Sequence, residues 1–166
     1  MRSIILFRHG KSDWEAKYSK DHERPLAKRG IKAAKKMGQL LSKRNETPDL
    51  LISSTALRAR KTAELAINNG KWTADTKYEK LIYGGSVNTL LSILKKQNDM
   101  HKTICLVGHE PIFSSFVEKI TITKWIKFPT AAMAKIIFKT EKWDEIELKP
   151  EKCDMNWFIK PKDLDQ

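Results

Sequence analysis

Long apolar stretches are missing from this 166-residue sequence, and no run approaches the roughly 20 residues that a helix needs to cross a bilayer. The N-terminus also lacks the apolar region and cleavage site of a secretory signal, because Ser3–Phe7 goes directly into a strand pattern. Cysteine is scarce: Cys105 and Cys153 stand 48 positions apart, which fits neither a metal site nor a disulfide framework. These absences predict a cytoplasmic protein without membrane contact and with no bound metal or cofactor.

Neither an internal repeat nor a break in composition divides the chain, so residues 1–166 are predicted to form a single domain with its own core. Acidic residues are outnumbered, with 20 Asp and Glu against 32 Lys and Arg, and the formal net charge is +12. The basic residues form no block of five or more, and no recognisable nucleic-acid module is present. Such a field attracts phosphorylated molecules, acidic protein surfaces or nucleic acid, although a lysine-rich solvated surface is the simpler explanation.

Apolar patterning predicts strands and helices in alternation. Four short apolar runs, the third of them weak, indicate strands, and helical spacing of apolar residues follows each one. The strands are predicted at Ser3–Phe7, Leu50–Ile52, Tyr78–Ile82 and Thr103–Val107, and the helices at Leu26–Leu41, Ala56–Ile67, Val87–Leu94 and Ile112–Ile120. Further strands of a meander or sheet edge are predicted at Ala134–Phe138, Glu145–Leu148 and Met155–Ile159, before a loose tail from about Pro161. This order predicts an α/β fold: a three-layer α/β/α sandwich with a mostly parallel central sheet and antiparallel additions late in the chain.

Arginine and histidine side chains gather where three of these strands end, and in an open parallel sheet ligands bind at those ends. The residues concerned are Arg8-His9-Gly10, Ser53-Ser54 with Arg58 in the following helix, and Gly108-His109. Guanidinium groups match phosphate oxygens in pairs and keep their charge. A neutral imidazole can attack phosphorus, and a second imidazole can donate a hydrogen bond to a phosphoryl oxygen. The combination predicts a phosphoryl-transfer site that needs no metal.

Four segments carry the motifs of this site. They are Arg8–Trp14, Glu23–Leu26 with Arg29-Gly30, Ser53–Ala59 with Thr62, and Val107–Pro111. In this order they resemble the histidine phosphatase superfamily over roughly residues 1–140. The short length and the Arg24-Pro25-Leu26 segment favour its SixA-type phosphohistidine phosphatases over its sugar-phosphate mutases. The resemblance implies a phosphoglycerate mutase-like fold.

The resemblance also implies a role for each matching residue. His9 would be the nucleophile and would become transiently phosphorylated, Arg8 and Arg58 would bind the phosphoryl oxygens, and His109 would complete the pocket. Water would then hydrolyse phospho-His9. Structural explanations exist for the same residues: His9 could be a satisfied histidine at a strand end, His109 a helix cap, and Arg58 a surface residue.

Two more residues are candidates for substrate binding. Arg24 precedes Pro25 at a position that resembles the border of the family's phosphate pocket, and Ser12 lies in the loop after the nucleophile. Arg24 could instead pair with Asp21 or Glu23 on the surface of the loop. His22 and His101 are expected on the surface because they lie in polar loop segments.

The general acid is the least defined part of the site. Many members of the superfamily use a carboxylic acid to protonate an alcohol leaving group. The candidates here are Glu79, which precedes the Gly84-Gly85 turn, and the loop residues Asp21 and Glu23, but none of them fits a family motif. This departure favours phosphohistidine or anhydride-like substrates, because their leaving groups demand less protonation.

The predicted function is therefore a metal-independent phosphatase that works through a phosphohistidine intermediate on His9 and removes phosphate from protein phosphohistidine. The partner would be a phosphorylated protein, for example a phosphotransfer domain with an acidic surface that suits the basic chain. One alternative is a phosphatase of a small phosphorylated metabolite, and another is a non-catalytic binder of phospho-ligands or nucleic acid. The retained nucleophile argues against a binder, so we expect no nucleic-acid partner. We also expect no membrane partner, and we expect a monomer.

Overall fold

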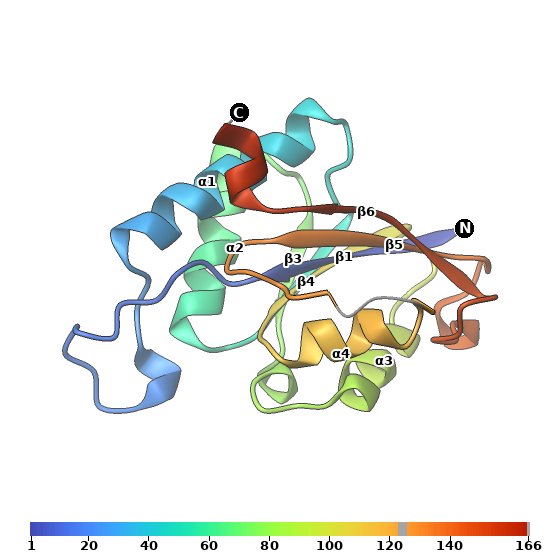
Figure 1. Ribbon diagram of the computed structural model, residues 1–166. Coiled ribbons are helices and arrows are strands. Elements are labelled where there is room, and N and C mark those ends of the chain that lie inside the picture. Colours follow the sequence, from blue (N-terminus) through green and yellow to red (C-terminus); the bar gives the residue numbers. More distant parts are fainter. Residues whose placement is uncertain (123–125, 166) are drawn as a thin grey trace.

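The computed structural model describes residues 1–122 and 126–165. Within that part of the chain, six strands form one sheet in the order β3-β2-β4-β1-β5-β6 (Figure 1). Their bounds are Arg2–Arg8 for β1, Leu50–Ser53 for β2, Asp75–Tyr78 for β3, Thr103–Gly108 for β4, Met133–Phe138 for β5 and Cys153–Ile159 for β6. Strands β3, β2, β4 and β1 pair in parallel, and β5 pairs antiparallel with both β1 and β6. The predicted mostly parallel sheet with late antiparallel additions is confirmed.

Helices cover both faces of the sheet (Figure 1). Helices α1 (Lys28–Lys43) and α2 (Leu57–Gly70) lie on one face, and α3 (Val87–Lys95) and α4 (Ile112–Glu118) lie on the other. Strand β1 is buried on both sides because its successive side chains point to opposite faces. Ile5 and Phe7 belong to the core beneath α1 and α2, whereas Ile4 and Leu6 belong to the core beneath α3 and α4. The three-layer sandwich is therefore confirmed.

Glycines allow α1 to lie very close to two neighbouring segments. A Cβ atom on Gly38 would stand 2.3 Å from the carbonyl oxygen of Ala66 in α2. A Cβ on Gly30, in the first turn of α1, would stand 2.2 Å from the carbonyl oxygen of Lys11. Because protein interiors are close-packed, neither contact leaves room for a methyl group. The start of α1 is thus packed directly against the loop that follows His9.

The strand predicted at Glu145–Leu148 is wrong. A 3₁₀ turn spans Trp143–Glu145, and the described residues between this turn and β6 form no strand. Trp143 and Ile146 are buried three positions apart, a spacing typical of a helical turn rather than of a strand. The indole of Trp143 is buried in the core and donates a hydrogen bond of 2.7 Å to the carbonyl oxygen of His101.

Two other boundaries differ from the prediction. The weak strand predicted at Tyr78–Ile82 lies earlier, at Asp75–Tyr78, and is followed by a 3₁₀ turn at Lys80–Ile82. All four residues of β3 are exposed, so this strand carries no apolar signal. The end of the chain forms a 3₁₀ turn over Pro161–Asp165 rather than a loose tail, and Leu164 packs it against the core.

Candidate active site

A hollow of about 590 Å³ opens where β1, β2 and β4 end. Its lining includes Arg8, His9, Lys11, Ser12, Trp14, Arg24, Arg58, Tyr83, His109, Glu110 and Thr130. The parallel register pairs Arg8 with Gly108, so the residues that follow them, His9 and His109, come side by side. Their ring centroids are 5.3 Å apart. The structure therefore brings together all four predicted catalytic residues and both predicted substrate-binding residues.

His9 is held as a neutral imidazole with one nitrogen free for chemistry. Its side chain is 6% exposed, and its Nδ1 lies 2.7 Å from the carbonyl oxygen of Gly10. Since a carbonyl only accepts, Nδ1 carries the proton and Nε2 keeps its lone pair. Burial, together with the charges of Arg58 and Arg8, lowers the pKa of His9 to about 3. The hydroxyl of Thr62 accepts a hydrogen bond from Gly10 N at 3.0 Å and fixes the loop.

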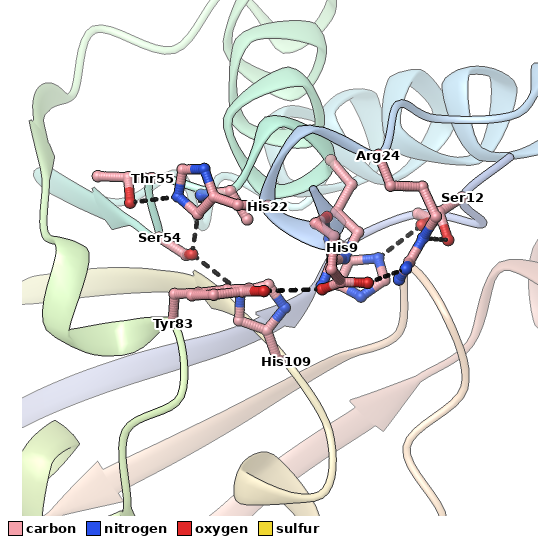
Figure 2. Close-up of polar contacts among 12 residues, drawn as sticks. His9, Ser12, His22, Arg24, Ser54, Thr55, Tyr83 and His109 are labelled. Carbon is pink, nitrogen blue, oxygen red and sulfur yellow. Dashed lines mark hydrogen bonds and ion pairs between the residues drawn. The ribbon is translucent and has the colours of Figure 1, made fainter. Parts of the chain in front are cut away.

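His109 is held by the end of β2. Its Nε2 lies 2.8 Å from the hydroxyl oxygen of Ser54 (Figure 2). This hydroxyl also accepts a hydrogen bond of 3.2 Å from Ala56 N. Burial and the nearby Arg58 lower the pKa of His109 to about 4. Ser54 thus positions the second imidazole, while α2 begins at Leu57 and its N-cap residue, Ala56, provides no side-chain hydrogen bond.

Arg8 and Arg58 reach the hollow from different elements. Nη1 of Arg8 donates to the carbonyl oxygen of Phe128 at 2.8 Å, and Nη1 of Arg58 donates to the carbonyl oxygen of Asp21 at 2.8 Å. Both side chains keep a buried Nε–H that has no acceptor among the described residues. The two guanidiniums therefore retain donor capacity that this part of the chain does not use.

Arg24 and Ser12 form the opposite wall. Nε of Arg24 donates to the hydroxyl of Ser12 at 2.9 Å (Figure 2), and its guanidinium lies 3.6 Å from the centroid of the exposed Trp14 ring. The side chain of Arg24 is nevertheless buried. Arg24 does pair with Asp21, as the alternative explanation had it, yet both the arginine and Ser12 still line the hollow.

Asp21 connects the two walls. Its carboxylate pairs with Arg24 and, at 3.0 Å, with Nη2 of Arg58, and it accepts a hydrogen bond of 2.8 Å from the Tyr83 hydroxyl. Although partial burial opposes ionisation, the Tyr83 hydrogen bond and the Arg58 charge hold the pKa of Asp21 below its ordinary value. The same bond raises the pKa of Tyr83. In this arrangement Asp21 is a counter-charge that orients two arginines, and Tyr83 stays a donor.

Glu79 lies outside this hollow. Its carboxylate accepts a hydrogen bond of 3.1 Å from Leu81 N and caps the 3₁₀ turn, and the side chain lines a different hollow beside α3. The structure therefore does not bring the candidate general acid to His9. Glu110 does line the site, where its carboxylate accepts from the backbone and hydroxyl of Ser114.

Three residues at or beside the hollow were not recognised from the sequence as part of the site: Glu110, Tyr83 and His22. Glu110 directly follows His109, so its place in the motif was a usable signal, but nothing near Tyr83 in the sequence marks that residue. His22, expected on the surface, is half-buried; its Nε2 lies 2.8 Å from the hydroxyl oxygen of Thr55, and its ring packs edge-on against Tyr83. These contacts depend on the 3₁₀ turn at Asp21–Glu23, which brings that loop against α2.

The described residues hold no group of three or more His, Cys, Asp or Glu side chains arranged to bind a metal ion. Across residues 1–122 and 126–165, no helix is both long enough and apolar enough to cross a membrane.

Comparisons with known proteins agree with this geometry. Residues 4–81 match the histidine phosphatase superfamily (branch 1). The chain is 31% identical to an uncharacterized protein of Mycobacterium tuberculosis over 151 residues, which cover 84% of this chain and 91% of that protein. The chain therefore belongs to the histidine phosphatase superfamily, and a phosphatase is the activity that this membership supports.

Within the superfamily the chain is of the SixA type. A crystal structure from Agrobacterium tumefaciens, assigned to the SixA phosphohistidine phosphatases, superimposes with a TM-score of 0.81 at 25% identity. The match covers 96% of this chain and 98% of that protein. A mycobacterial glucosyl-3-phosphoglycerate phosphatase shares the fold at a TM-score of 0.67 and 12% identity, over 94% of this chain and 97% of its own. The phosphoglycerate mutase-like fold is confirmed.

Proposed function

We propose that the protein is a metal-independent phosphatase that removes phosphate from protein phosphohistidine through a phosphohistidine intermediate on His9. The observation that carries this proposal is the neutral, buried His9 imidazole, whose Nε2 is free while Arg8, Arg58 and His109 surround it. A nucleophile of this kind attacks only when its partners also hold the phosphoryl group in line.

The charges of the hollow suit a phosphoryl group. Three arginines and Lys11 stand against the carboxylates of Asp21 and Glu110, which leaves an excess of positive charge for an incoming phosphoryl dianion. Fixed donors of this kind stabilise the charge that builds up on the transferring oxygens. Electrostatic stabilisation by the chain's own side chains is why we propose a reaction without a metal.

The first step forms one bond and breaks another. Nε2 of His9 attacks phosphorus while the phosphorus–nitrogen bond of the substrate breaks, and the departing imidazole takes a proton from solvent. Water then attacks the phosphorus of phospho-His9, which releases inorganic phosphate and restores the neutral imidazole. Neither step requires a strong acid in the hollow, and this agrees with the ionised state of Asp21 and the remote position of Glu79.

The test is turnover in EDTA by the wild type and by His9→Ala. The substrates are a histidine-phosphorylated phosphotransfer domain and a panel of sugar and nucleoside phosphates. We expect phosphate release from the protein substrate by the wild type, and none by His9→Ala. A clear preference for one small phosphate ester would indicate that the substrate is a phosphorylated metabolite. Binding without any turnover would favour the non-catalytic alternative.

A further inference from the structure

A second, strongly basic groove adjoins the active site. It has a volume of about 410 Å³ and shares Lys11 and Thr130 with the hollow around His9. One wall is the first half of α1, and the other is the end of the chain around the Pro161–Asp165 turn. Figure 1 shows this C-terminal turn lying alongside α1. A protein substrate whose phosphoryl group lies at His9 would therefore have this groove directly beside its bound residue.

The groove carries a large excess of positive charge. Six basic side chains line it against one carboxylate, that of Asp165, which pairs with Lys36 at 2.6 Å. The other five form no ion pair with any residue that the structure describes: they are Lys11, Arg29, Lys32, Lys160 and Lys162. Lys32 lies close enough to the Asp165 carboxylate to help lower its pKa, yet one carboxylate against six cations still leaves the groove strongly positive.

The fold arranges these cations in an ordered way. Arg29, Lys32 and Lys36 follow one another at three- and four-residue steps, so they share one face of α1. The opposing turn is held in place by Leu164, which packs against the core beneath that helix. The groove is thus a fixed concave surface between two packed elements rather than a scatter of surface lysines.

We infer that this groove docks an acidic surface of the phosphorylated protein beside its phosphohistidine, an inference that rests on the proposed function. Five unpaired cations spread over three segments suit a row of carboxylates better than one additional phosphate group. A nucleic acid suits the groove less well, because its lining contains no aromatic side chain on which a base could stack. Complementary charge of this kind raises the rate of encounter and fixes orientation.

The test compares two charge-reversal pairs. K32E/K162E reverses one cation on each wall of the groove. K35E/K95E makes the same change in net charge at two exposed lysines that do not line the groove, one on α1 and one on α3. Two readouts are used: binding of a fluorescent ten-residue polyglutamate peptide, and the ratio of kcat/KM for a phosphohistidine protein of net negative charge to that for a small aryl phosphate.

We expect K32E/K162E to weaken peptide binding and to lower the kcat/KM ratio by roughly tenfold each, with less than about a twofold effect from K35E/K95E. Equal losses in the two pairs would overturn the inference, as would tighter binding of a ten-residue oligothymidylate than of the peptide. An unchanged ratio in K32E/K162E would refute the docking groove but leave the proposed function standing. Groove-dependent peptide binding by a wild type that cannot hydrolyse phosphohistidine would instead refute the proposed function.

Discussion

Mild acid should destabilise the protein through the two imidazoles of the site. Burial lowers the pKa of His9 to about 3 and that of His109 to about 4, whereas an unfolded histidine titrates near about 6.5. At pH values between the folded-state and the unfolded-state pKa, these two histidines are protonated in the unfolded chain but neutral in the folded protein. Stability therefore falls as pH drops below about 6.5, and the loss continues until the folded-state pKa values are reached.

The size of the effect follows from the same values. At pH 5 the solution is about 1.5 pH units below the pKa of an unfolded histidine. The resulting loss of folding stability is about 2 kcal/mol for each imidazole and about 4 kcal/mol for both. Carboxyl groups do not account for the stability change expected between pH 7 and pH 5. The pKa values of Asp21 and Glu46 are lowered in the folded protein, so their contribution is lost only below the ordinary range near about 4.

Urea unfolding at pH 7 and at pH 5 measures this loss directly. The wild type should lose about 4 kcal/mol between the two conditions, and His9→Asn/His109→Asn should lose almost none of that amount. Each single variant should lose about half. A double variant whose stability falls as steeply as that of the wild type would refute the reasoning, because the loss would then come from groups other than these imidazoles.

Three further predictions concern single substitutions. Arg58→Ala should lower kcat by roughly 100-fold on any phosphate substrate, since it removes a donor to the phosphoryl oxygens and takes from Asp21 one of its two arginine partners. Gly30→Ala should cost about 1–3 kcal/mol in urea unfolding and reduce turnover, because its methyl group would collide with the backbone of Lys11 beside the nucleophile. Glu79→Gln should leave kcat unchanged across aryl phosphates of rising leaving-group pKa, because this carboxylate caps a turn outside the hollow.

Each of these outcomes has a clear opposite. Full activity in Arg58→Ala would remove that residue from phosphate binding. A stable and active Gly30→Ala would mean that the loop after His9 does not depend on close packing against α1. A kcat for Glu79→Gln that falls increasingly as the leaving group becomes poorer would restore Glu79 as the general acid.

The main frame of the fold was predictable because it depends on local patterns. The run Ile4–Phe7 is apolar on both faces, as a central parallel strand must be, and α1 shows regular helical spacing. Strand β3 was misplaced because an exposed edge strand carries no apolar pattern. Glu145–Leu148 was misassigned because its four residues alternate between polar and apolar, as a strand would, although they only continue the turn at Trp143–Glu145.

The candidate site was predictable where it depends on strand ends. His9 and His109 follow neighbouring strands, so the sheet brings them together whatever the loops do. The contacts of Asp21 with Arg58 and Tyr83 could not be foreseen in the same way, since they join three segments through the path of a loop.

The most direct test of the account is to trap the phosphorylated enzyme. Wild type and His9→Ala are mixed with a ³²P-labelled phosphohistidine protein and quenched in alkali, where phosphohistidine survives. The labelled peptides are then identified by mass spectrometry. We expect label on the peptide that contains His9 in the wild type and no label in the variant. Label on another residue, or a burst of free phosphate with no labelled enzyme, would contradict nucleophilic catalysis by His9.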